Sequence, residues 1–205
     1  MAELTLQSYF ARLDLDKTFG RAAPLHVDLG CGDGSFLAAL AERNPEKNFL
    51  GIERLAGRAE KAWRKAARTN NLHVLHVEIS YALRYLLPEC SVETFYLLFP
   101  DPSPKRRHRQ RRIVTGEFLS SAHAALRENG LLRIATDQRD YFEQIVRLGR
   151  SHSGFATLRE FASADYFAIV DVAEADFPPT NFERKFQEQG MPIYRLELRK
   201  ISPVT

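Results

Sequence analysis

Acidic residues stand at the ends of several predicted strands. Asp28 lies in a short strand-like run, and Glu53 ends the next one. Asp101 and Asp137 follow two later runs. The carboxyl ends of parallel strands meet at one edge of a sheet, and ligands of open α/β folds bind there. Carboxylates on that edge can accept hydrogen bonds from a ligand or stabilise a developing positive charge, so the sequence predicts a crevice with acids on its rim.

A glycine-rich turn follows the first of these runs. Gly30, Gly32 and Gly34 have the spacing GxGxG, and Ser35 stands where a dinucleotide-binding motif would carry its last glycine. This spacing favours a ligand that presses against bare backbone, such as S-adenosylmethionine, over a pyrophosphate. Glu53 is then placed to accept hydrogen bonds from both hydroxyls of a ribose. The alternative is a tight turn followed by a surface acid.

The residues Pro100-Asp101-Pro102 end the fourth predicted strand. Pro102 disfavours helical backbone at Asp101, and Pro100 has a fixed φ and no N–H group. The Asp101 carboxylate is therefore presented at a stiff strand end, as a catalytic acid must be. A purely structural turn could carry the same sequence.

A strongly basic run follows immediately. Residues 105–112 hold six Lys and Arg residues and no acid. The rest of the chain carries 23 of the 29 basic residues and all 26 acidic ones, so it is slightly acidic. Such a run is often a solvated face, but its position directly after a strand end favours a polyanionic partner.

Strand and helix patterns alternate five times along the chain, which predicts an α/β fold with a parallel sheet and helices on both faces. We expect one domain over residues 1–205. The tail departs from this rhythm, with extended and partly irregular structure over 155–173, a helix over 180–189 and a last strand over 193–199. The predicted strands are 26–29, 48–52, 73–77, 94–99 and 131–135, and the predicted helices are 35–43, 55–69, 82–87, 117–127 and 140–151.

Composition excludes several classes of protein. With 44% hydrophobic and 27% charged residues, the chain is typical of an ordinary globular protein. No apolar run approaches the roughly 18 residues of a membrane span, and the N-terminus carries no targeting pattern, so we expect a cytoplasmic protein without a membrane partner. Cys31 and Cys90 form no CxxC pair, and His73 and His76 should point to opposite faces of a strand. We therefore expect no metal site.

Together these motifs resemble the bacterial tRNA (guanine-N7-)-methyltransferase family over about residues 19–199. The resemblance is carried by Asp28-Leu-Gly-Cys-Gly-Asp-Gly-Ser-Phe-Leu, by Asn48-Phe-Leu-Gly-Ile-Glu53, by the block from Leu98 to Arg112, by Ala135-Thr-Asp137 and by Thr180-Asn-Phe-Glu183. The central block is the most distinctive part, because other methyltransferases share only the glycine turn and the acid that follows it.

The resemblance implies a Rossmann-like methyltransferase fold, a seven-stranded, mostly parallel sheet with helices on both faces and an antiparallel last strand. It implies S-adenosylmethionine as methyl donor, S-adenosylhomocysteine as product, and guanine 46 in the tRNA variable loop as acceptor. The implied cofactor-binding residues are Asp28, Gly30, Gly32, Glu53, Glu78 and Asp101, with Asp101 also catalytic. The implied tRNA-binding residues are Lys105, Arg106, Arg107, Arg109, Asp137, Thr180, Asn181, Phe182 and Glu183.

Three residues depart from the family pattern. Glu78 stands where the family usually has Asp, Ser103 replaces a usual Trp, and Asn181 replaces a usual Lys or Arg. Two other functions are therefore kept as alternatives. One is a methyltransferase acting on a different RNA or on a small nucleophile, and the other is a non-catalytic module that binds the cofactor and RNA.

Overall fold

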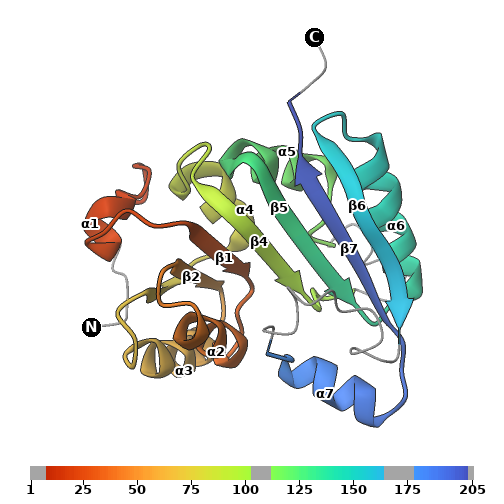
Figure 1. The fold of residues 1–205 in the computed structure, drawn as a ribbon, viewed down its shortest axis with the longest axis horizontal. Helices are drawn as coiled ribbons and strands as arrows, with labels where there is room; N and C mark the ends of the chain where they lie inside the picture. Colours follow the sequence, from red (N-terminus) through yellow and green to blue (C-terminus); the bar gives the residue numbers. More distant parts are fainter. Residues whose placement is uncertain (1–7, 103–111, 164–177, 203–205) are drawn as a thin grey trace.

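The computed structural model describes residues 8–102, 112–163 and 178–202. In this part of the chain a seven-stranded sheet has the order β3-β2-β1-β4-β5-β7-β6 (Figure 1). All strands run parallel except β7, which is antiparallel to both of its neighbours, so the predicted sheet is confirmed. The strands are β1 (Leu25–Leu29), β2 (Asn48–Glu53), β3 (Leu72–His76), β4 (Val92–Leu98), β5 (Leu126–Thr136), β6 (Phe155–Ser163) and β7 (Ile193–Lys200).

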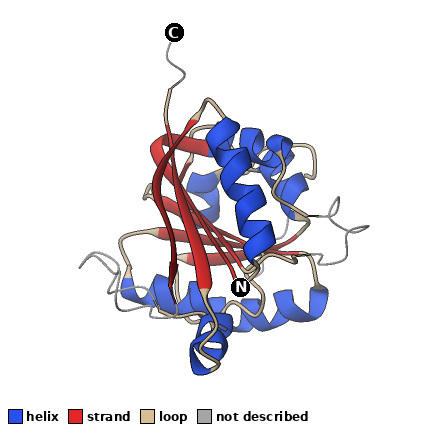
Figure 2. Cartoon of the chain, turned by 90° about the vertical axis from the view of Figure 1, so that its right-hand side faces the viewer, coloured by secondary structure: helices blue, strands red, loops and turns tan. Residues whose placement is uncertain are grey.

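Helices pack on both faces of this sheet, over different strands on each face (Figure 2). Helices α2 and α3 pack on β2 and β3 on one face, whereas α5 and α6 pack on β5, β6 and β7 on the other. Helix α7 lies beyond the ends of β4 and β5 (Figure 1). The helices are α1 (Leu15–Phe19), α2 (Ser35–Arg43), α3 (Ala56–Ala66), α4 (Ile79–Tyr81), the π-helical η1 (Ala82–Leu86), α5 (Gly116–Ala125), α6 (Arg139–Ser151) and α7 (Asn181–Glu188).

Burial explains why the sequence forms these elements. Every residue of β1 and β2 is buried, as expected for central strands that are covered on both faces. Helix α6 repeats Tyr141, Phe142, Ile145 and Val146 at helical spacing, and all four side chains are buried. The strands whose ends form the predicted site are therefore anchored in the buried core.

Several predicted boundaries were wrong. The helix predicted over 55–69 covers only Ala56–Ala66. Helix α5 ends at Ala125 rather than at 127, and β5 begins at Leu126, so Gly130 lies inside the strand instead of before it. A side chain at Gly130 would come within 2.8 Å of the Arg127 carbonyl oxygen, so close backbone packing selected this glycine. Residues 155–163, expected to be extended and partly irregular, form the edge strand β6, because β7 supplies a pairing partner far along the chain. The register of this pairing shifts between Thr157 and Arg159.

Candidate cofactor and active site

The glycine turn between β1 and α2 is fastened to the end of β2. The amides of Gly30 and Cys31 both donate to the Ile52 carbonyl, at 2.8 and 3.0 Å. The Gly32 amide donates to Glu53 Oε2 at 3.0 Å, and the Leu55 amide donates to Glu53 Oε1 at 2.8 Å. Glu53 therefore shapes the turn, and its remaining lone pairs can still accept bonds from a ligand.

Two of the glycines differ in what their missing side chains allow. Gly32 has φ +58°, and a Cβ atom there would meet no atom within 4 Å, so its backbone borders open space. At Gly34, with φ +74°, a Cβ atom would come within 2.8 Å of the Ala62 Cβ. Gly32 thus belongs to a bare-backbone cradle, whereas Gly34 lets α2 pack closely against α3.

Asp28 is a buried acid beside this cradle. The residue is only 3% exposed. Burial and the nearby charge of Glu53 raise the pKa of Asp28 to about 7. A buried carboxylate beside bare backbone fits a ligand that brings its own N–H groups. The cradle, Asp28 and Glu53 therefore fit the amino and ribose groups of S-adenosylmethionine.

Glu78 occupies the same edge of the sheet, directly after β3. The Val77 amide donates to the Glu53 carbonyl at 3.1 Å, which places the two acids on adjoining segments. The Glu78 side chain is exposed and accepts a hydrogen bond from the Tyr81 amide at 2.9 Å, capping α4. The Glu78 side chain, which is one methylene longer than the Asp usual in the family, is therefore held at the N-terminus of α4 and remains open to solvent.

The end of β4 has an unusual backbone. Phe99 has φ +53°, an uncommon conformation for a bulky residue that is often found at functional sites. Its amide donates to the Ala135 carbonyl at 2.8 Å. The centre of its ring lies 5.7 Å from the centre of the Phe182 ring and 5.5 Å from that of the Phe186 ring. This geometry turns the chain out of the sheet and leaves Asp101 exposed at the rim.

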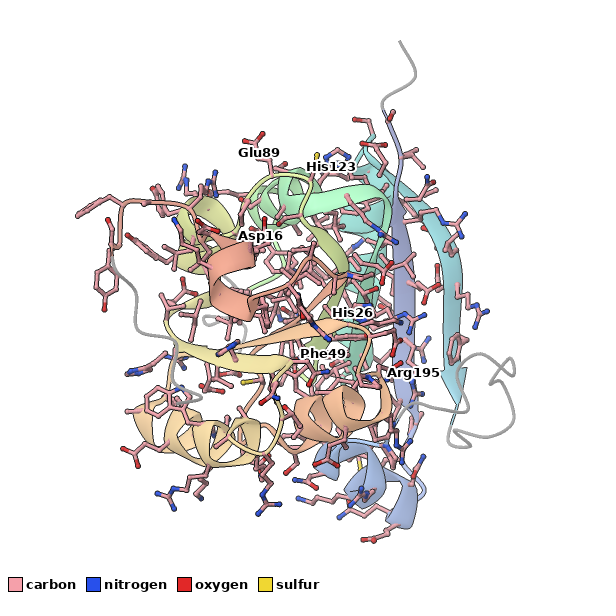
Figure 3. All side chains as sticks on the ribbon, turned by 60° about the vertical axis from the view of Figure 1, so that its left-hand side comes forward. Asp16, His26, Phe49, Glu89, His123 and Arg195 are labelled. Carbon is pink, nitrogen blue, oxygen red and sulfur yellow. The ribbon has the colours of Figure 1, made fainter. Side chains whose placement is uncertain are left out.

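Helix α7 reaches the same rim through its N-terminus. Thr180 and Glu183 form a capping box, in which the Glu183 amide donates to Thr180 Oγ1 and the Thr180 amide donates to Glu183 Oε2. Arg195 of β7 donates to the buried Glu183 at 3.0 Å, at the end of β7 that faces α7 (Figure 3). Thr180 and Glu183 therefore hold the segment in place, whereas Asn181 and Phe182 are exposed.

A groove extends from this rim across the sheet face that carries α2. The space along it, counted together with the adjoining open solvent, is about 590 Å³. Phe36, Leu98 and Ala135 line it near the strand ends. Farther along, Arg133 and Glu197 line it and form an ion pair at 2.7 Å. The groove supplies space for a substrate directly beside the end of β4.

The structure thus brings together Asp28, Glu53 and Glu78 on one stretch of the edge, and the end of β4 and α7 on the next. Asp137 follows β5 on the same edge and accepts a hydrogen bond from the Gln138 side chain at 2.6 Å. The predicted RNA-contacting residues Lys105, Arg106, Arg107 and Arg109 lie outside the described residues.

Sequence reasoning missed the position of Arg112. We counted it among the cations of an exposed loop, but it is 3% exposed and contacts α6. The available signal was the apolar pair Ile113 and Val114 that directly follows it, because Val114 is fully buried and draws the chain into the core. Phe99 and Phe186, which pack α7 onto the rim, were also not identified.

Two other kinds of site are absent from the described residues. No group of three or more His, Cys, Asp or Glu side chains in these ranges is arranged to hold a metal ion. The helices seen in the described ranges are all too short or too polar to cross a membrane.

Solved structures that share this fold include several methyltransferases. The 16S rRNA methyltransferase KamB has a TM-score of 0.66 at 15% identity, with 93% of this chain and 95% of that chain covered. The 16S rRNA (adenine(1408)-N(1))-methyltransferase of Catenulisporales acidiphilia has a TM-score of 0.63 at 17% identity, with 100% and 99% covered. Residues 22–196 also match the profile of a family described as "Putative methyltransferase". The fold and the site therefore define a methyltransferase.

Relatives of higher identity narrow the class. The tRNA (guanine-N(7)-)-methyltransferase of Thermotoga maritima is 38% identical, with 92% of this chain and 58% of that protein covered. The Halalkalibacterium halodurans enzyme is 35% identical, with 88% of this chain and 80% of that protein covered. The Leifsonia xyli enzyme is 36% identical, with 92% of this chain and 82% of that protein covered. The chain belongs to the tRNA (guanine-N(7)-)-methyltransferase family, although it spans little more than half of the Thermotoga protein.

Proposed function

We propose that this protein transfers a methyl group from S-adenosylmethionine to N7 of a guanine in tRNA, at position 46 of the variable loop. The observation that carries the proposal is the position of Asp101. Asp101 follows β4 after a strained backbone at Phe99, whose ring packs on α7. β4 adjoins β1, the strand that leads into the glycine turn. Family membership supplies the substrate class. Because tRNA is that substrate, the cytoplasm is the expected location.

The cofactor site is assigned to the first three strand ends. Gly30 and Gly32 give close access to bare backbone, and Asp28 accepts hydrogen bonds from the amino group of the cofactor. Glu53 accepts from its ribose hydroxyls, and Glu78 from its adenine amino group. When bound, S-adenosylmethionine supplies an electrophilic methyl group on sulfur.

Asp101 has an electrostatic role in this proposal. N7 of guanine carries a lone pair and no hydrogen, so the attack needs no general base. Positive charge develops on the guanine ring as the methyl group moves, and a fixed carboxylate beside the ring stabilises that charge while accepting hydrogen bonds from its N–H groups. Phe182, which is 51% exposed and lies next to Phe99, offers an apolar surface for stacking a base.

Substrate positioning is assigned to the rest of the rim. Asp137 and Asn181 present polar groups there, and Thr180 and Glu183 fix the start of α7. Lys105, Arg106, Arg107 and Arg109 are proposed to contact phosphates, which offsets the few kcal/mol needed to draw the guanine out of its stacked position.

The test compares Asp101→Asn with Glu89→Gln in methyl transfer to unmodified tRNA. Asn keeps the shape of Asp and most of its hydrogen-bond acceptance but removes its charge, so we expect turnover to fall by about 10² to 10³ with little change in cofactor affinity. Glu89 is exposed and precedes β4, at the opposite end of the same strand (Figure 3), so its substitution should leave turnover unchanged.

Borohydride and aniline treatment cleaves RNA at 7-methylguanosine and locates the product. Methyl incorporation into tRNA that this treatment leaves intact would assign another acceptor atom. Transfer to a different RNA or to a small molecule, with none to tRNA, would replace the proposed substrate. Cofactor binding without transfer to any acceptor would favour the non-catalytic module.

A further inference from the structure

Arg112 closes the basic run, but its side chain is turned inward. Its guanidinium uses each of its three nitrogens as a donor. Nε donates to the Pro102 carbonyl at 2.8 Å, one terminal nitrogen donates to Gln144 Oε1 at 2.8 Å, and the other donates to Asp140 Oδ2 at 2.6 Å. The guanidinium carbon lies 4.5 Å from the centre of the Tyr141 ring. Its side chain is 2% exposed, so it offers little surface to a phosphate.

These contacts join two separate parts of the protein. Gln144, Asp140 and Tyr141 belong to α6, which is packed on the sheet through its buried apolar side. Pro102 directly follows Asp101 and belongs to the segment that leaves β4. Arg112 therefore ties that segment to a rigid helix.

The other side of the same segment is also fastened. The Phe99 amide donates to the Ala135 carbonyl, and the Phe99 ring packs on α7. Asp101 thus lies between two fixed points, Phe99 and Pro102. Each peptide between them has few remaining degrees of freedom, because Pro100 and Pro102 also fix their own φ angles.

We propose that Arg112 is a positioning residue for methyl transfer, which holds the Pro102 carbonyl against α6 and thereby sets the place of Asp101. This inference rests on the proposed function. It separates Arg112 from the other cations of residues 105–112, because those are assigned to RNA phosphates and Arg112 is not.

The role requires arginine rather than any cation. A planar guanidinium can donate in three directions at once and can stack on an aromatic ring, whereas an ammonium on a flexible stem cannot reproduce this geometry. Arg112→Lys keeps the positive charge but loses the planar arrangement of donors. Arg112→Met keeps much of the apolar stem and loses every donor.

The experiment measures kcat, the dissociation constant for tRNA and its salt dependence in Arg112→Lys, Arg112→Met and the control Arg139→Ala. Arg139 is also on α6, but its side chain is 77% exposed and forms an ion pair with Glu143, one turn along the same helix. Displacing a reactive group by about 1 Å can lower rate about 10²-fold, so we expect kcat to fall by roughly 10- to 100-fold in Arg112→Lys and further in Arg112→Met. Affinity for tRNA and its salt dependence should stay within about twofold of the wild-type values, and the control should match wild type.

A double variant tests whether Arg112 acts through Asp101. In the Asp101→Asn background, Arg112→Lys should lower kcat much less than it does alone, because residues that share one interaction have non-additive effects. Additive losses would show that Arg112 acts elsewhere and would overturn the proposal. So would a loss of tRNA affinity with a flatter salt dependence, since that result would make Arg112 an RNA contact.

Hydrogen exchange gives a readout that needs no methyl transfer. Loosening Pro102 should speed exchange of the Phe99 amide in Arg112→Lys while the amides of the β5–β7 pairing keep their protection. Unchanged exchange of the Phe99 amide would overturn the proposal that Arg112 holds Pro102 in place, even if the enzyme methylates tRNA. Faster exchange of the Phe99 amide in a protein that methylates nothing would instead support the role of Arg112 in holding Pro102 and reject the proposed function.

Discussion

Asp28 and Glu53 place two carboxylates in one buried corner, where their charges oppose each other. Asp28 responds with a raised pKa, because burial and the Glu53 charge both disfavour its ionised form. A cationic amino group bound there would favour the ionised form. Cofactor binding below pH 7 should therefore release a proton from Asp28.

The raised pKa makes stability depend on pH in a defined direction. Unfolding returns the pKa of Asp28 from about 7 to its ordinary value near 4, so between these values the folded state binds more protons than the unfolded state. Wild-type stability should therefore fall, relative to Asp28→Asn, as pH rises from about 4 to about 7, with a slope of up to about 1.4 kcal/mol per pH unit. Above pH 7 the difference should be constant. Urea denaturation of both proteins between pH 4.5 and 8 measures it.

Asp33 provides a control with the opposite sign. Burial acts to raise its pKa, but hydrogen bonds from Lys65 and Ser35 outweigh this and lower it. Its stabilising effect is then fully present above about pH 4, so the stability difference between wild type and Asp33→Asn should not change over the same pH range. A parallel pH dependence in the two variants would contradict the assignment to Asp28.

At the scale of elements, the glycine turn has two separate tasks. It leaves bare backbone at Gly32 and lets α2 and α3 approach at Gly34. The close approach is possible because Ala62 on α3 faces Gly34, and both positions are small. These tasks can be separated by one methyl group at each position.

We expect Gly34→Ala to lower stability more than Gly32→Ala. Both substitutions place a Cβ atom at positive φ, which costs about 1–2 kcal/mol. Only Gly34→Ala also drives a methyl group against the Ala62 Cβ and Cα atoms, at 2.8 and 2.9 Å, which adds about 1–3 kcal/mol of overpacking. Urea denaturation gives the two losses.

Cofactor affinity should follow the reverse order. A methyl group at Gly32 enters the space of the cradle, whereas at Gly34 it points toward α3. Calorimetric titration with S-adenosylmethionine should therefore show the larger loss in Gly32→Ala. If both variants lose stability and affinity in equal proportion, the division of tasks is wrong.

At the scale of the whole molecule, charge is distributed unevenly along the chain. Apart from residues 105–112, acidic residues outnumber basic ones, so attraction to RNA should depend strongly on that run. Since Arg112 is buried, the cations that can meet phosphates precede it. Selection of the guanine is then assigned to the rim, where Asp101, Asp137 and Asn181 lie.

Binding to tRNA should weaken steeply with salt. Replacing Arg106, Arg107 and Arg109 together with Ala should flatten the slope of log affinity against log salt by roughly 0.7 to 0.9 for each phosphate that is no longer neutralised, because fewer counterions are released. Filter binding over a range of salt concentrations measures the slope, and cofactor affinity should be unchanged.

A second triple variant removes the same charge elsewhere. Arg84, Arg147 and Arg150 are exposed on η1 and α6, which pack on the face of the sheet away from α2. Their replacement with Ala should leave the salt slope close to that of wild type. If both triple variants flatten the salt slope equally, the effect comes from net charge alone. The basic run would then be a solvated face and not an RNA contact.

Much of the fold could be predicted from the sequence because its signals are local. Buried runs such as 48–52 and the turn glycines define strands and their ends within a few residues of chain. Acids near the ends of such runs must lie at the carboxyl edge of a parallel sheet, so Asp28, Glu53 and Asp101 could be placed there before any packing was known. The resemblance of the motif blocks then supplied the family.

Tertiary structure decided what depends on partners far along the chain. β5 extends back to Leu126, and residues 155–163 form a strand, because strands β4 and β7 pair with them. Arg112 belongs to a cationic run, yet it turns inward because α6 offers it acceptors and an aromatic ring. Gly32 and Gly34 look alike in the sequence, and only the approach of α3 distinguishes them. Short-range patterns determine which elements form and where they end, whereas the role of a side chain at the site is set by the neighbours that long-range packing brings to it.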